Sequence, residues 1–216
     1  VYPPLSLLTV AAMLPEQWQK KLVDLSVQEL HENDLEWADF VFLTGMYVHR
    51  DSMREIVARC NEAGVKVVAG GPYVTHGYEM FPGVDHFVLN EAEITLPMFL
   101  DDLERGCPEP IYTTTELANT HETPMPLWEL ADMNLYVEGL IQYSRGCPYQ
   151  CDFCDVTALF GRLPRTKTAD QIITELNSMG DLNRFRSIFF ADDNLIGNKK
   201  LLKSELLPAL IEWRQQ

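Results

Sequence analysis

The strongest constraint on the fold is the alternation of apolar runs with helical patterns along the first half of the chain. Residues 38–43 form an apolar run of the kind found in buried parallel strands. Residues 65–69 and 86–89 repeat this pattern, and segments with the apolar spacing of helices lie between the runs. This alternation predicts an α/β fold with a doubly wound parallel sheet over residues 1–106.

Local signals refine these boundaries. A capping box at Ser52–Glu55 predicts the start of a helix that ends at Gly64. Residues 21–25 alternate as a strand does, and residues 4–14 have the composition of a helix. Residues 1–3 look like the tail of a strand, so we expect that some sequence is missing at this point.

Several small or polar residues follow the predicted strands directly. The carboxyl ends of parallel strands meet at one edge of a sheet, and ligands bind along that edge. Glycine there allows a close approach of backbone to ligand, although an ordinary turn would use the same residues. The candidate ligand-binding residues of this edge are Thr44, Gly45, Gly70, Gly71, Pro72 and Glu91.

Composition limits the partners of the chain. Its 216 residues carry a net charge of −15, and no basic cluster is longer than a dipeptide, which argues against nucleic acid or anionic membrane as a main partner. Solubility is the simpler explanation of the acidity. The sequence has five cysteines and no visible signal peptide or membrane span, which predicts a reducing, cytoplasmic location.

A second domain is predicted after a linker. Residues 107–134 contain four prolines and a threonine-rich centre, which is typical of a linker. Residues 135–216 then show strand patterns at 137–143 and 187–191. Each strand precedes a helical pattern, at residues 172–179 and 201–213, so this part predicts two β/α units.

Three cysteines follow the first of these strands in a Cys-x3-Cys-x2-Cys spacing, namely Cys147, Cys151 and Cys154. Thiolates are the normal ligands of a [4Fe-4S] cluster. Three of them hold three irons and leave the fourth open for a small chelating ligand such as S-adenosylmethionine. The alternatives are a zinc site or three unrelated thiols, but zinc sites usually need two separated ligand pairs.

These motifs resemble those of the cobalamin-binding radical S-adenosylmethionine proteins, in the branch that contains the hopanoid methylases. The resemblance covers nearly the whole chain. It implies a Rossmann- or flavodoxin-like cobalamin domain at residues 1–106 and, from residue 135, the start of a partial (β/α)6 TIM-like barrel. The segments that carry it are 4–12, 70–72, 91–97, 141–148, 161–167 and 192–199.

Two departures from the family accompany the resemblance. The Asp-x-His-x-x-Gly motif that supplies a histidine ligand to cobalt elsewhere is absent, although its place falls where sequence is expected to be missing. The usual Gly-Glu-Gly-Glu turn is replaced by Asn90-Glu91-Ala92-Glu93, whose added side chains would narrow a ligand groove. Only two of six β/α units are present, so most of the barrel is expected to lie outside this sequence.

The resemblance implies an enzyme with a [4Fe-4S] cluster, S-adenosylmethionine and cobalamin as cofactors. Its expected activity is methylation of an unactivated carbon of a small-molecule or lipid substrate through a 5′-deoxyadenosyl radical. An electron donor such as flavodoxin or ferredoxin is an expected partner. The alternatives are a cyclase or rearrangement enzyme that does not methylate, and a cobalamin-binding module without catalysis.

The resemblance also implies roles for particular residues, each with a simpler alternative. Thr44 and Gly45 are expected to line the corrin or its nucleotide tail. His49 is a candidate cobalt ligand or an ordinary surface residue. The end of the strand at 187–191 is expected to contact the amino group of S-adenosylmethionine or to cap a helix, through Asp192, Asp193 and Asn194. A basic turn is expected to hold a cofactor carboxylate or phosphate, or to be solvated, through Arg162, Arg165 and Lys167.

Overall fold

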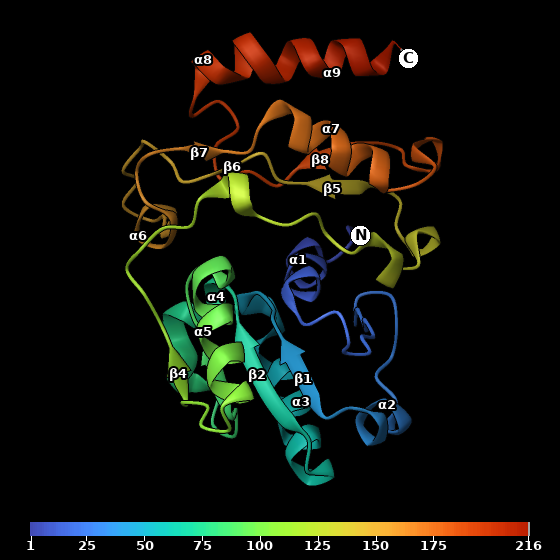
Figure 1. Ribbon diagram of the computed structural model, residues 1–216, viewed down its shortest axis with the longest axis vertical. Coiled ribbons are helices and arrows are strands. Elements are labelled where there is room, and N and C mark those ends of the chain that lie inside the picture. Colours follow the sequence, from blue (N-terminus) through green and yellow to red (C-terminus); the bar gives the residue numbers. More distant parts are fainter. Residues whose placement is uncertain (216) are drawn as a thin grey trace. The chain divides into compact units, whose positions relative to one another are not determined.

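A computed structural model describes residues 1–215 (Figure 1). The chain forms two compact units: residues 28–118 make one, and residues 1–27 join the chain from residue 119 onward to make the other. No helix among the residues described has the length and apolar character needed to cross a membrane.

The unit of residues 28–118 is built on a four-stranded sheet. The strands are β1 (Phe40–Leu43), β2 (Lys66–Gly70), β3 (His86–Val88) and β4 (Ile111–Tyr112), and they lie in the order β1-β2-β3-β4. All three neighbouring pairs are parallel. The predicted α/β fold with a parallel sheet is therefore confirmed for this unit, and β4 is an additional strand in the segment expected to be a linker.

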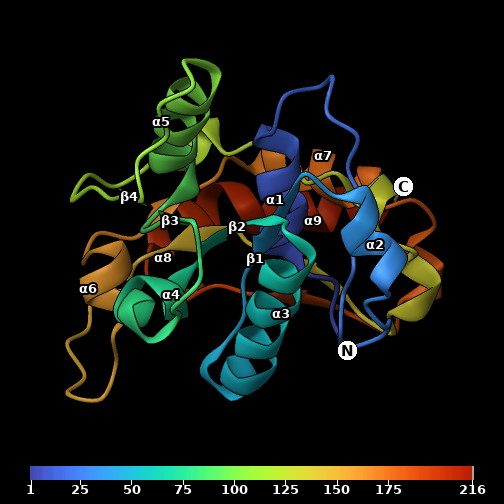
Figure 2. The same ribbon diagram turned by 90° about the horizontal axis from the view of Figure 1, so that it is seen from below.

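Helices pack on both faces of this sheet (Figure 2). Val41 and Leu43 of β1 contact the core that α3 contributes to, whereas the alternate residues Phe40 and Phe42 make edge-on ring contacts with Phe99 of α5. Side chains of a strand alternate between faces, so β1 serves both layers. The four helices of the unit are α2 (Glu32–Trp37), α3 (Arg50–Ala63), α4 (Pro72–Gly77) and α5 (Ala92–Glu104).

The other unit contains two small pairs of strands. In one pair β5 (Gly139–Ile141) runs parallel to β8 (Ile188–Phe190), and in the other β6 (Ser144–Arg145) runs antiparallel to β7 (Arg165–Thr166). The two β/α units predicted here are present, since α7 precedes β8 and a helical segment follows it. Its helices are α1 (Leu5–Met13), α6 (Val156–Phe160), α7 (Ala169–Ser178), α8 (Lys199–Leu201) and α9 (Leu207–Arg214).

The segment predicted to be a linker contributes to a core instead. Trp128 and Met133 are buried with Leu8 of α1 and with Tyr143. The expected strand at residues 21–25 is absent: Leu22 packs onto the same core from irregular backbone, and Leu25 is exposed. The predicted domain boundaries, 1–106, 107–134 and 135–216, stay a prediction. The two compact units of the structure meet at other positions along the chain, after residues 27 and 118.

Two helix starts differ from expectation. A 3-10 turn at residues 47–49 leads directly into α3, so Ser52 lies inside that helix and its hydroxyl donates to the carbonyl of His49 rather than capping. At the other end of the chain a π-helical turn, Leu202–Leu206, joins α8 to α9. Pro208, at the start of α9, follows this π-helical turn directly, so the residue that lacks an N–H lies where the regular helical hydrogen-bond pattern changes.

A reciprocal capping box forms at α7. The Thr168 hydroxyl accepts from the amide of Gln171 at 3.1 Å, and the Gln171 side chain accepts from the amide of Thr168 at 2.9 Å. We expect Thr168→Ala to lower the free energy of unfolding by about 1 kcal/mol, measured by urea denaturation. Thr168→Ser keeps the acceptor, so an equal loss in that variant would contradict a capping role.

Candidate functional site

The segment from Gly146 to Cys154, called the cysteine loop below, begins in a backbone conformation that requires glycine. Gly146 has φ of 89°, and a Cβ there would lie 2.8 Å from the carbonyl oxygen of Phe160 and 2.9 Å from that of Leu163. The amide of Cys147 donates to the carbonyl of Gly161 at 3.2 Å. The turn after α6 therefore lies directly against the start of the loop.

The rest of the loop is more open. Cys151 is exposed, Phe153 is 91% exposed, and the amide of Cys154 donates to the carbonyl of Cys151 at 3.1 Å. All three loop cysteines are free thiols. Among residues 1–215, no three His, Cys, Asp or Glu side chains come together at the spacing of a metal site.

The donor set nevertheless suits an iron–sulfur cluster. Three thiols on one short loop match the ligand type that such clusters need, and none of the three is committed to a disulfide. Cys60 is fully buried in the other unit and Cys107 is exposed beyond α5, so neither belongs to this loop. The predicted ligand roles of Cys147, Cys151 and Cys154 stay a prediction.

The end of β8 lies beside this loop. Asp192 accepts from the amide of Tyr143 at 3.3 Å and from the amide and hydroxyl of Ser144. Asp193 accepts from the amide of Gly146 at 2.9 Å. Burial raises the pKa of the Asp192 carboxyl, and the hydrogen bonds from Ser144 and Tyr143 offset part of that rise.

Asn194 reaches the first cysteine. Its side-chain amide donates to the sulfur of Cys147 at 3.4 Å. The alternative of a helix cap is wrong for Asp192, Asp193 and Asn194, because the next helix, α8, is capped by Asn198. The predicted contact of these three residues with S-adenosylmethionine stays a prediction.

The basic turn divides into exposed and buried members. Arg162 is exposed, and its guanidinium lies 3.4 Å from the Gln150 side chain and 3.5 Å from the carbonyl of Pro148, both in the cysteine loop. Arg165 donates to the carbonyl of Phe160 at 3.1 Å. Both arginines therefore border the loop, where their predicted role in holding a cofactor carboxylate or phosphate stays a prediction.

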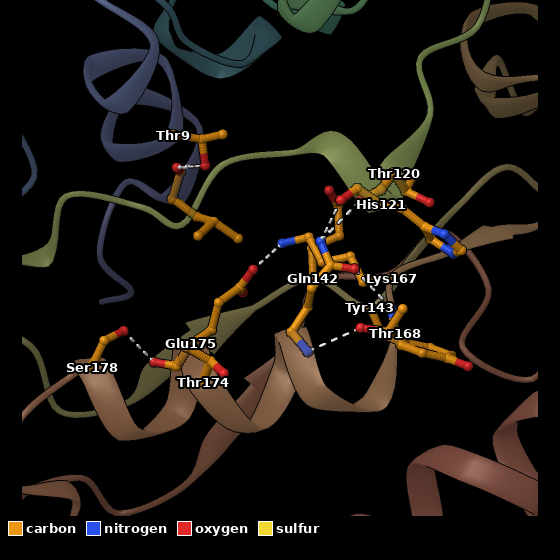
Figure 3. A network of polar contacts seen from close by, with 12 residues as sticks. Thr9, Thr120, His121, Gln142, Tyr143, Lys167, Thr168, Thr174, Glu175 and Ser178 are labelled. Atoms are coloured by element: carbon orange, nitrogen blue, oxygen red, sulfur yellow. Dashed lines mark hydrogen bonds and ion pairs between the residues drawn. The ribbon is translucent and has the colours of Figure 1, made fainter.

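Lys167 is not part of a solvated turn or an open anion site. It is buried in an ion pair with Glu175 of α7, with side chains 4% and 3% exposed (Figure 3). Burial raises the pKa of the Glu175 carboxyl, although Lys167 and Arg145 favour its charged form. The second carboxylate oxygen, Oε2, has no hydrogen-bond partner in the described chain. Lys167 is therefore corrected from a candidate ligand to a core residue.

Sequence reasoning also missed Glu175 and Ser144. Glu175 lies on the face of α7 that includes Ile172, Leu176 and the following Met179, all buried. A carboxylate on an apolar face signals a buried partner, and that signal was present in the sequence. Ser144 carries no such signal, because only the fold brings it to Asp192.

The predicted ligand edge of the other unit is assembled. Leu43 pairs with Ala69 and Gly70 pairs with Val88, so the residues after β1, β2 and β3 share one edge of the sheet. A Cβ on Gly71, whose φ is 94°, would lie 2.4 Å from the hydroxyl of Thr44. The backbone of Gly71 therefore lies close to the Thr44 side chain, at the edge where Thr44, Gly45, Gly70 and Gly71 were expected to bind a ligand. Pro72 begins α4 at the same edge.

Two other residues at this edge have partners within the fold. Glu91 is 3% exposed, and its carboxylate accepts from the amide of Ala118 at 2.9 Å. Its predicted contact with cobalamin stays a prediction. His49 is exposed, and its Nδ1 accepts from the amide of Met46 at 3.2 Å. That bond leaves Nε2 as the nitrogen available for a ligand role.

The geometry of Gly146 leads to a direct test. Gly146→Ala is expected to lower the free energy of unfolding by at least about 1 kcal/mol more than Gly180→Ala, since overpacking costs about 1–3 kcal/mol. Gly180 is the matched control: its φ is 82°, but nothing lies within 4 Å of a Cβ there. Equal losses in denaturant unfolding would show that the carbonyls around Gly146 move aside freely.

Comparison with known proteins gives the family context. Residues 1–100 match the family model for the B12 binding domain. The uncharacterised methyltransferase sll1242 of Synechocystis sp. is 42% identical over 216 residues, covering 99% of this chain and 40% of that protein. The hopanoid C-2 methylase of Rhodopseudomonas palustris is 38% identical over 218 residues, covering 99% of this chain and 41% of that protein. The chain thus spans about 40% of the length of these curated relatives.

Solved structures share the fold. The cobalamin-dependent S-adenosylmethionine radical enzyme OxsB, solved with aqua-cobalamin and S-adenosylmethionine, matches 80% of this chain and 28% of its own, with a TM-score of 0.57 and 19% identity. The radical S-adenosylmethionine methyltransferase TsrM from Kitasatospora setae, solved with cobalamin and a [4Fe-4S] cluster, matches 82% of this chain and 40% of its own, with a TM-score of 0.60 and 14% identity.

The sequence identities to the solved structures are low, so those matches support only the fold. The evidence for homology comes from the curated relatives. Together they confirm the predicted resemblance to cobalamin-binding radical S-adenosylmethionine proteins. Residues 1–100 thus carry a B12 binding domain, and nearly the whole chain is similar to part of the hopanoid C-2 methylase.

Proposed function

We propose that this protein is a cobalamin-dependent radical S-adenosylmethionine methyltransferase that acts on an unactivated carbon of a small-molecule or lipid substrate. The observation that carries this proposal is the loop of three free cysteines, tied to the end of β8, in a homologue of methyltransferases. The barrel to which β5 and β8 would belong is part of the same proposal.

In this proposal Cys147, Cys151 and Cys154 hold a [4Fe-4S] cluster. When bound, the cluster, S-adenosylmethionine and cobalamin together supply reductive cleavage of S-adenosylmethionine and transfer of a methyl group to a substrate radical. The chain's own residues bind and orient these groups. Arg162 and Arg165, at the border of the loop, are positioned to pair with a carboxylate.

The sheet edge of the other unit would hold cobalamin. A Cβ on Gly70 would lie 2.5 Å from the carbonyl oxygen of Val88, and one on Gly71 would lie 2.4 Å from the Thr44 hydroxyl, so only glycine fits at these two positions. Because neither residue has a side chain, the backbone at this edge is open to a large ligand in this proposal. Thr44 offers a hydroxyl at the same edge. No histidine is needed as a cobalt ligand in this proposal, although Nε2 of His49 is open to that role.

Anaerobic reconstitution of the full-length protein with ferrous iron, sulfide and hydroxocobalamin tests the function. The methyltransferase predicts a four-iron cluster, bound corrinoid, and three products together: S-adenosylhomocysteine, 5′-deoxyadenosine and methylated substrate. A small reductant or a flavodoxin or ferredoxin would supply electrons. Absence of iron from protein with intact thiols would overturn the proposal.

The same assay separates the alternative functions. A cyclase or rearrangement enzyme would release 5′-deoxyadenosine without S-adenosylhomocysteine, and a binding module would release neither. The name of the Rhodopseudomonas relative makes a hopanoid-like polycyclic lipid the first substrate to offer. A cytoplasmic location remains part of the proposal, and fractionation of cells that produce the full-length protein would test it.

A further inference from the structure

Three consecutive residues after β8 direct polar groups at the segment that leads into the cysteine loop. Asp192 binds the amides of Tyr143 and Ser144, and Asp193 binds the amide of Gly146. Asn194 donates to the sulfur of Cys147. Residues 192, 193 and 194 thus contact residues 143–144, 146 and 147 in the same order. The end of β8 therefore sets the position of the first cysteine.

Neither familiar role of such residues explains these contacts. A helix cap is ruled out because α8 begins five residues after Asn194 and uses Asn198. A role in binding the ammonium of S-adenosylmethionine does not account for them either, because Asp192 directs both of its carboxylate oxygens at residues 143 and 144 of the chain itself. Asn194 differs from both aspartates because it presents a donor to a thiol sulfur.

A neutral N–H on a ligand sulfur has a known electrostatic effect. Hydrogen bonds to cluster sulfurs are among the features that set reduction potential, and partners in the outer shell tune metal sites. Adding an electron increases the negative charge on the sulfur, so an N–H donor stabilises the reduced form more than the oxidised form. Loss of that donor makes the cluster harder to reduce.

We propose, on the basis of the function proposed above, that Asn194 is a positioning residue that raises the reduction potential of the cluster through its hydrogen bond to Cys147. Asp192 and Asp193 fix the backbone around that bond. The segment Asp192–Asn194 thus connects β8, the second strand of the proposed barrel, to the reduction potential of the cluster on the cysteine loop.

The test is a redox titration of the reconstituted full-length protein, followed by electron paramagnetic resonance of the reduced cluster. Asn194→Leu removes the donor and keeps similar volume. We expect the ratio of reduced to oxidised cluster at a fixed potential to fall about tenfold, which is about 59 mV for one electron. Asn194→Gln keeps a donor and should recover part of the shift.

Matched measurements keep the test decisive. Asn198→Leu removes another asparagine of the same segment that contacts Leu201 rather than the loop, and its potential should equal that of the parent. If Asn194→Leu loses iron while its remaining clusters titrate as in the parent, Asn194 is merely structural and the inference is wrong. An unchanged potential at full iron content also refutes it. A parent protein without any cluster overturns the proposed function itself.

Discussion

Lys167→Met is expected to lower the free energy of unfolding by about 3–5 kcal/mol, because it leaves the Glu175 carboxylate buried without its partner. Both side chains are almost fully buried, and one carboxylate oxygen has no other partner in the described residues. Equilibrium unfolding in urea measures the loss. The double variant Lys167→Met, Glu175→Leu removes both charges and should recover most of it, since an apolar pair of similar volume is often neutral.

The loss of stability in Lys167→Met should depend on pH and should grow as the pH rises. Burial raises the pKa of Glu175, so the folded protein holds that proton more tightly than the unfolded chain does. Stability contributed by the protonated form therefore falls as pH rises above the ordinary carboxyl pKa of about 4.3. Without Lys167 the pKa of Glu175 rises further, and the deficit of the variant should be larger at pH 7 than at pH 5.

A surface ion pair provides the control for Lys167→Met. Lys66 and Asp85 lie 2.6 Å apart, but the lysine side chain is 61% exposed. Lys66→Met should therefore cost no more than about 1 kcal/mol. If Lys66→Met and Lys167→Met lowered the free energy of unfolding by the same amount, burial would not explain the contribution of the Lys167–Glu175 pair to stability.

Cys147→Ala is expected to abolish cluster binding in the full-length protein and to reduce cleavage of S-adenosylmethionine by more than about 100-fold. Loss of an outer-shell partner alone costs about 10- to 100-fold, and a ligand should cost more. Iron analysis, the visible spectrum of the cluster and the yield of 5′-deoxyadenosine measure the effect. Cys151→Ala and Cys154→Ala should behave alike.

Cys107→Ala is the matched control for the loop variants. Cys107 is also a free thiol and is exposed, but it lies beyond α5 in the other unit. Its loss should leave iron content and 5′-deoxyadenosine formation unchanged. Retention of iron in Cys147→Ala, or a comparable loss in Cys107→Ala, would remove the chemical basis for a cluster on the loop.

Much of the fold was readable because apolar periodicity depends on local sequence. The runs at 38–43, 65–69 and 86–89 became parallel strands, and the helical patterns between them became helices. Residues 21–25 have an alternating pattern as well, but they pack as irregular backbone on a core made by distant residues. The segment 107–134 was predicted to be a linker from its prolines, although Trp128 within it is buried in the same core.

The candidate site was readable to the extent that it follows strand ends. The sheet edge and the cysteine loop were placed correctly along the chain because residue spacing and strand order determine them. The pairing of individual side chains was not. Asn194 reaches Cys147, 47 residues away, only because β8 ends beside the loop. Lys167 and Glu175 are eight residues apart, but their pairing depends on both being buried in the same core.

The division of the chain has a consequence for synthesis. Leu8 completes a core whose other members lie from Trp128 onward, so the first 27 residues must wait for their partners to leave the ribosome. Residues 28–118 meet no such delay, because their sheet and helices are contiguous in sequence. Nascent chains are therefore expected to acquire the parallel sheet before α1 finds its partners, and α1 remains available to chaperones until translation has passed the cysteine loop.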